Sequence, residues 1–271
     1  MKKSLNLFDL KQKVDYKTEI LSGLTVAIAL VPEAIAFAML AGFSPLTGLY
    51  AAFVMGIITA IFGGRPGMIS GATGAIAVVF LGLITELNER FPGIDSEEVL
   101  QYVFATVILA GIFQILAGVF KMGKFIRLVP HPVMFGFVNG LAVIIFTSQF
   151  GSFVSKETGE LIPMQAFLTL LGFAVLTMLI IWLLPKVTKA IPSSLAAIIV
   201  VSAIVIGFGI DTKTVKDTLD EGASIQGSFP PLSIPTIPLT WETFLLILPY
   251  AGIVAGVGLI ESLLSLNLLD E

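Results

Sequence analysis

Residues 63–85 read GGRPGMISGATGAIAVVFLGLIT, and this stretch decides how the chain folds. Five glycines and one proline lie in its first twelve residues, so a stable helix is not expected before about Gly71. A helix from Gly71 to Thr85 would be roughly 22 Å long, which is shorter than the roughly 30 Å hydrocarbon core of a bilayer. We therefore predict an extended entry that reaches mid-membrane, followed by a half-helix.

A short hydrophobic segment interrupted by glycine is the best sequence indicator of a binding site in a secondary transporter. The first amides of such a half-helix have no partner in the helix, and its dipole is positive at that end. Both properties favour an anion. The alternative is a re-entrant structural kink that binds no ligand.

Composition places the chain in a membrane. It is 56% hydrophobic and 13% charged, whereas soluble domains carry about 25% charged residues. Eight apolar segments approach the roughly 20 residues needed to cross a bilayer, and they cover residues 20–42, 47–63, 68–85, 99–120, 128–150, 161–184, 191–210 and 243–269. Because lipid cannot satisfy an irregular backbone, each segment should be helical. We predict an all-α integral membrane protein with a cytoplasmic N-terminal segment, 1–19, and a transmembrane domain, 20–271.

Positive charges indicate the orientation of the chain. With a cytoplasmic N-terminus and alternating sides, eleven Lys and Arg residues lie inside and four lie outside. The four outside are Arg90, Lys156, Lys213 and Lys216. This imbalance agrees with the positive-inside rule. We expect an integral protein of the bacterial inner membrane, in contact with lipid.

Other classes of function lack their usual residues. The sequence has no cysteine and one histidine, which removes thiol chemistry and makes histidine-rich metal sites unexpected. There is no Ser/His/Asp set, no phosphate-binding loop motif and no basic patch for nucleic acid. We therefore expect neither an enzyme nor a nucleic-acid-binding protein, and no cofactor.

Two acidic residues, Glu33 and Glu261, lie well inside the apolar segments, where charges mark pathways or coupling sites. Pro32 frees backbone groups beside Glu33. Ser265 follows Glu261 by one helical turn, so its hydroxyl is expected on the same helix face. A carboxylate with a hydroxyl suits Na⁺, and a carboxylate alone suits H⁺. The alternative for either residue is a protonated carboxyl that only fixes helix packing.

Glu33 near an anion is electrostatically unfavourable, because two negative groups repel strongly in a low dielectric. We therefore expect Glu33 to be protonated when the anion is bound, and it could then carry a coupled proton.

Several motifs, in order and at matching spacing, resemble the SulP (sulfate permease) family. They are residues 32–38 (PEAIAFA), 45–50 (PLTGLY), 71–75 (GATGA), 130–133 (PHPV), 136–140 (GFVNG) and 258–265 (GLIESLLS). The resemblance covers nearly the whole chain. It implies the first repeat of a seven-plus-seven inverted-repeat transporter fold with a discontinuous third span, in which a core domain moves against a gate domain.

The resemblance also implies site residues. The anion would sit between the N-terminal ends of half-helices three and ten, with Thr73, Gly74 and Ala75 at the first of these ends. Glu33 stands where many members have Gln beside the substrate, and Phe37 matches an aromatic residue that lines the same cavity. Similar sodium-coupled bicarbonate members carry Asp at the position of Glu261 and Thr at that of Ser265. The longer Glu leaves Na⁺ and H⁺ both open.

The second repeat and the C-terminal STAS domain typical of the family are absent from the 271 residues. We expect an incomplete transporter that does not transport alone, and a homodimer for the full-length protein. The expected function is secondary active transport of a sulfate- or bicarbonate-class anion, coupled to Na⁺ or H⁺. The alternatives are a nucleobase–cation symporter of the same architecture, a passive anion channel and a non-transporting scaffold.

Overall fold

The computed structural model describes residues 15–63, 67–122, 131–154, 160–188, 191–212, 214, 229 and 234–270. Within these ranges the side chains of 131, 134, 264 and 266–270 are not described. Most of the predicted N-terminal segment (1–14), residues 64–66 of the glycine-rich stretch and most of the loop 211–240 lie outside the described residues.

The described chain is helical, and its helices coincide in order with the eight predicted apolar segments. The helices are α1 (Tyr16–Leu40), α2 (Pro45–Phe62), α3 (Gly74–Arg90), α4 (Ser96–Val119), α6 (His131–Ser148), α7 (Met164–Val187), α8 (Ser193–Phe208) and α9 (Trp241–Asp270), with a short 3₁₀ helix η1 (Gln149–Phe153) after α6. Six of these segments are long and apolar enough to cross a membrane. The prediction of an all-α integral membrane protein is confirmed.

The third span is discontinuous, as predicted, but its boundaries differ. Residues 67–73 are not helical, and α3 begins at Gly74, three residues later than expected. The delay arises because Thr73 adopts an extended backbone (φ −124°, ψ 142°) and acts as the N-cap. At its other end α3 continues past Thr85 to Arg90.

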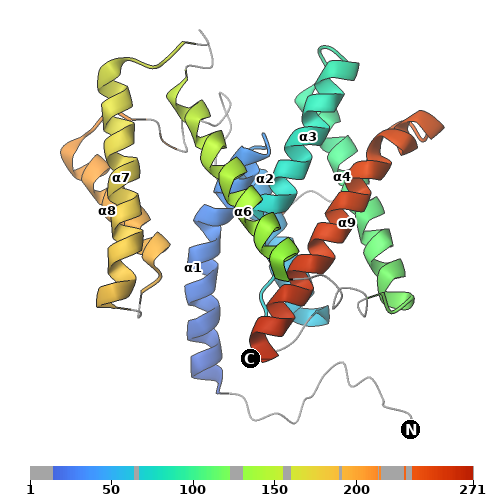
Figure 1. Cartoon of the computed structure of the whole chain (residues 1–271), viewed down its shortest axis with the longest axis horizontal. Helices are drawn as coiled ribbons and strands as arrows, with labels where there is room; N and C mark the ends of the chain where they lie inside the picture. The colour runs from blue at the N-terminus through green and yellow to red at the C-terminus, as the bar shows by residue number, and fades with distance from the viewer. Residues whose placement is uncertain are drawn as a thin grey trace.

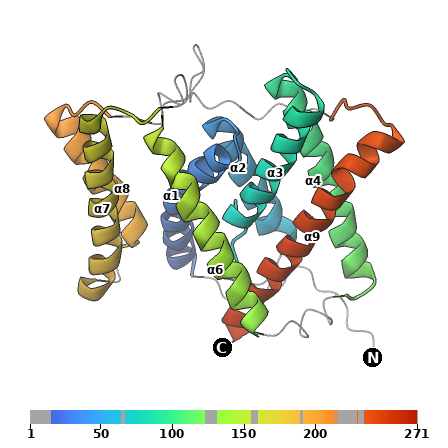
Figure 2. The same cartoon turned by 45° about the horizontal axis from the view of Figure 1, so that its top comes forward.

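The helices form two unequal groups (Figures 1 and 2). On one side α3, α4 and α9 pack together, and their side chains make up most of the buried core, including the fully buried Leu83, Leu87 and Thr106. On the other side α7 and α8 form an antiparallel pair, and α7 buries no residue. The helices α1, α2 and α6 lie between the two groups.

The α1–α2 corner depends on one close approach. Ser44 caps α2 by accepting a hydrogen bond from the Thr47 amide, and Pro45 occupies the first turn, where its missing N–H costs nothing. This start turns Gly48 directly onto α1, where it contacts the Ala34 carbonyl oxygen and the Ala38 methyl group. Only a residue without a side chain fits this crossing.

Some polar side chains inside the helices are satisfied within one turn, and others lie near helix ends. The hydroxyl of Thr106, which is fully buried, donates to the Tyr102 carbonyl oxygen one turn earlier at 2.8 Å, as expected where no water is available. At the C-terminal end of α7, the Lys186 ammonium lies 3.0 Å from the centroid of the exposed Trp182 ring. This cation–π pair is typical of a membrane–water interface.

Candidate functional site

The N-terminus of α3 presents backbone amides with no helical partner. The Thr73 hydroxyl accepts a long hydrogen bond (3.4 Å) from the Ile76 amide, and the Thr73 carbonyl accepts the first intrahelical bond, from Ala77 at 3.1 Å. Within the described part of the chain, no hydrogen bond is made by the amides of Gly74 and Ala75. One of the orphan amides is thus capped by a side chain, and two remain available to a ligand.

Apolar side chains enclose these amides. A Cβ built on Gly74 would lie 2.8 Å from Ile145 Cδ1 of α6 and 2.9 Å from Phe37 Cε1 of α1. Gly74 and Ala75 are both buried. Glycine at this position therefore allows α1 and α6 to approach the start of α3, and water has little access to the amides from that side.

Glu33 lies on the face of α1 that runs alongside the non-helical residues 67–73. On that face Leu30 contacts the Cβ position of Gly71 and, two turns later, Phe37 contacts that of Gly74. Glu33 falls between these contacts in the helix register. Its side chain is exposed, and among the described residues it makes no hydrogen bond or ion pair.

Glu261 on α9 reaches the same helix end. Its partly buried carboxyl lies beside the Thr73 side chain. The Thr73 hydroxyl can accept from the Ile76 amide and donate to the carboxylate at the same time. A residue predicted to bind the cation therefore lies next to a residue predicted to bind the anion.

The Ser265 hydroxyl was expected on the same helix face as the Glu261 carboxylate, but it does not hydrogen-bond that carboxylate. Its hydroxyl donates to the backbone carbonyl of Glu261 at 3.0 Å, not to the carboxylate, and the side chain is exposed. Because the hydrogen atom is engaged by the backbone, the oxygen lone pairs stay available to a cation. In the described residues no group of three or more His, Cys, Asp or Glu could hold a metal ion, so any cation here would rely on one carboxylate and neutral oxygens.

The structure thus gathers Phe37, Thr73, Gly74, Ala75 and Glu261 around the start of α3. Ile145 was missed by the sequence analysis, because it sits in an uninterrupted apolar span and carries no signal of its own.

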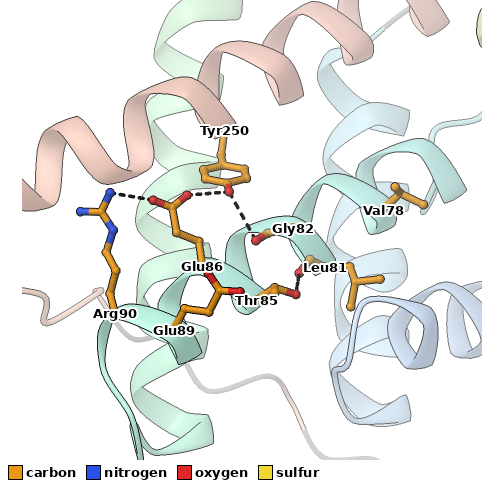
Figure 3. A pocket seen from close by; sticks show the side chains of 8 residues that line it. All are labelled: Val78, Leu81, Gly82, Thr85, Glu86, Glu89, Arg90 and Tyr250. Carbon is orange, nitrogen blue, oxygen red and sulfur yellow. Dashed lines mark hydrogen bonds and ion pairs between the residues drawn. The ribbon is translucent and has the colours of Figure 1, made fainter.

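An open groove of about 760 Å³ lies at the opposite end of α3, against α9 (Figure 3). Its lining residues are Val78, Leu81, Gly82, Thr85, Glu86, Glu89, Arg90 and Tyr250. None of these residues was proposed from the sequence. The groove is separate from the start of α3, so it is not the predicted anion site.

The sequence profile of the Sulfate permease family matches residues 16–271. The "Putative sulfate transporter YbaR" of Bacillus subtilis is 43% identical over 98% of this chain and 51% of its own length. The "Bicarbonate transporter BicA" of Picosynechococcus is 32% identical over 93% of this chain and 46% of its own length. The solved transmembrane domain of a cyanobacterial bicarbonate transporter BicA has a TM-score of 0.72 at 29% identity, covering 93% of this chain and 66% of that one.

The chain therefore spans about half the length of the curated relatives it matches.

Proposed function

Since the chain belongs to the sulfate permease family, we propose that it takes part in secondary active transport of a small inorganic anion of the sulfate or bicarbonate class. The observation that carries the proposal is the pair of unpartnered amides, Gly74 and Ala75, at a helix start inside the transmembrane domain. Two of the relatives have names that refer to sulfate or bicarbonate transport. An oxyanion of this kind accepts several hydrogen bonds and is favoured by the helix dipole.

At the start of α3, the backbone amides would provide affinity for the anion, and the surrounding apolar side chains would provide selectivity. The two amides donate to the anion, and Phe37 and Ile145 limit water on one side, which strengthens each electrostatic contact. Among the described residues the walls carry no positive side chain, which favours an anion held weakly enough to leave. This combination suits a transporter better than a storage site.

The position of Glu261 supports coupling to a cation. Its carboxylate and the anion would compete for the same positive helix end, because both are negative and both lie beside Thr73. A cation removes this conflict. Na⁺ would do so by binding the carboxylate and the Ser265 oxygen, and H⁺ by protonating the carboxyl. Cation and anion then bind together more favourably than either alone.

Uptake into proteoliposomes that carry the full-length protein tests this function. We expect accumulation of labelled sulfate or bicarbonate driven by an inward Na⁺ or H⁺ gradient. An unlabelled anion should reduce this uptake only if it binds the same site as the labelled one. Flux that ignores both gradients would identify a passive channel, and competition by uracil would identify a nucleobase symporter. Either of these outcomes contradicts the proposal.

The role of Glu33 has a separate test. We propose that Glu33 is protonated while the anion is bound, because in the register of α1 it falls between Leu30 and Phe37, which lie against the broken third span. Replacing Glu33 with glutamine, which resembles the protonated form, is expected to flatten the pH dependence of uptake and to keep anion affinity at acidic pH. Initial rates between about pH 5 and 8 provide the measurement. An unchanged pH profile and affinity would exclude this role.

We further propose that the full-length protein is a homodimer of the inner membrane with a cytoplasmic N-terminus. The distribution of positive charge supports this orientation.

A further inference from the structure

Tyr250 of α9 forms a second polar contact with α3, in the groove away from the anion site (Figure 3). Its hydroxyl donates to Glu86 Oε2 at 2.7 Å and also lies 3.3 Å from the Gly82 carbonyl oxygen. The other oxygen of Glu86 pairs with Arg90 Nη2 at 2.8 Å. Glu86 is therefore held from both sides, and it offers Tyr250 a fixed acceptor.

The Thr73–Glu261 pair lies at another place along the same two helices, α3 and α9. On α9, Tyr250 precedes Glu261 by about 16 Å of helix. On α3, Thr73 precedes Gly82 and Glu86 by about 13 and 20 Å. The spacings agree because α3 and α9 run in opposite directions, as Figures 1 and 2 show. The distance along α9 falls between the two distances along α3, so sliding α9 along α3 would displace both pairs together.

Half of the ten residues between Tyr250 and Glu261 on α9 are glycine or alanine. The Tyr250 ring rests on Gly82, since a Cβ built there would lie 3.5 Å from Tyr250 Cε1. The buried residues of α9 that follow are small, with Ala251, Val254 and Ala255 all less than 9% exposed. Small side chains let helices approach closely, but they resist sliding weakly. Directional hydrogen bonds specify a register that such packing leaves open.

We propose that Tyr250 and Glu86 are positioning residues that set the axial register of α9 on α3 and thereby hold Glu261 against Thr73. The proposal rests on the function proposed above, because it assigns them a role through the Thr73–Glu261 pair. They touch neither ion. Their effect is on the affinity of cation and anion for the site and on the coupling between the two.

The test uses Tyr250→Phe, which removes the hydroxyl and keeps the ring on Gly82. In proteoliposomes of the full-length protein, we expect the KM for the anion and the half-saturating cation concentration each to rise about fivefold or more, the usual size of a coupling effect. The maximal rate per folded transporter should stay near the unmodified value.

Variants of Glu86 separate positioning from mere stability. Glu86→Gln keeps an acceptor for the Tyr250 hydroxyl and should retain most of the affinity, whereas Glu86→Leu should reproduce Tyr250→Phe. Glu89→Gln is the matched control, because Glu89 lines the same groove and makes no hydrogen bond or ion pair among the described residues. It should leave both constants unchanged.

Two results would overturn the positioning role. One is unchanged affinities in both Tyr250→Phe and Glu86→Leu. The other is a loss of folded protein in these variants while the surviving transporter keeps its affinities. Failure of the proposed function gives a different result, since Thr73→Val and Glu261→Gln would then also leave uptake unaltered.

Discussion

Replacing Glu261 with glutamine is expected to lower cation-driven anion uptake by about 100-fold or more, the largest effect of any single change at the site. A factor of 100 corresponds to about 2.7 kcal/mol, within the range of one charge-assisted hydrogen bond and its buried partner. The amide keeps the shape of the carboxyl and can still accept from the Thr73 hydroxyl. The glutamine amide has no negative charge to bind Na⁺, and it cannot take up H⁺ as a carboxylate does.

Uptake of labelled anion with and without a cation gradient measures this effect. The residual uptake of Glu261→Gln should no longer respond to Na⁺ or to pH, because the carboxylate that binds the cation is gone. Glu242→Gln is the control on the same helix, since Glu242 is an exposed carboxylate in the first turn of α9. It should transport normally. If Glu261→Gln retained gradient-driven uptake, the coupling role of Glu261 would be wrong.

Gly48→Ala is expected to have the largest effect on folding. The added Cβ would overlap the Ala34 carbonyl oxygen and lie 3.1 Å from the Ala34 carbonyl carbon and 2.7 Å from the Ala38 Cβ. Two of these three atoms belong to the α1 backbone, so no side-chain rotation relieves the contact. Overpacking of this kind costs roughly 1–3 kcal/mol and more where backbone must shift. We expect a lower unfolding temperature in detergent and a smaller yield of folded protein.

Gly56→Ala provides the matched control for that experiment. Gly56 lies two turns further along α2, and a Cβ built there has nothing within 4 Å. Alanine is the better helix former by about 1 kcal/mol, so this variant should be as stable as the unmodified protein or slightly more stable. Equal unfolding temperatures for Gly48→Ala and Gly56→Ala would show that the α1–α2 crossing tolerates a side chain.

The architecture could be predicted because lipid imposes strong constraints on sequence. Long apolar segments must be helices, and the glycines before Gly74 mark a segment whose first described residues are not helical. The exact residues at which α3 begins and ends were harder to predict. The start of α3 is set by the extended Thr73, and its end at Arg90 is supported by the Glu86–Arg90 pair one turn apart. Both depend on local hydrogen bonds that hydropathy does not report.

The site was only partly predictable, for a different reason. Glycine, threonine and glutamate inside apolar segments are visible in the sequence, and so each could be singled out alone. The contact between Thr73 and Glu261 joins residues far apart in the chain, and it depends on how α9 packs along α3. Tyr250 could not be anticipated, because a tyrosine inside an apolar helix carries no sequence signal that names its partner on another helix.

The cation–π pair near the end of α7 has a consequence for lipid thickness. The Trp182 ring and the Lys186 ammonium both prefer the headgroup layer, and α7 begins at Met164. The apolar length from Met164 to Trp182 is about 27 Å, close to the thickness of a thinner biological bilayer. Lipids with longer acyl chains would draw Trp182 below the headgroups at a cost that grows with each ångström of mismatch. Bilayers of short-chain lipids therefore match α7 with little tilt, and thicker ones do not.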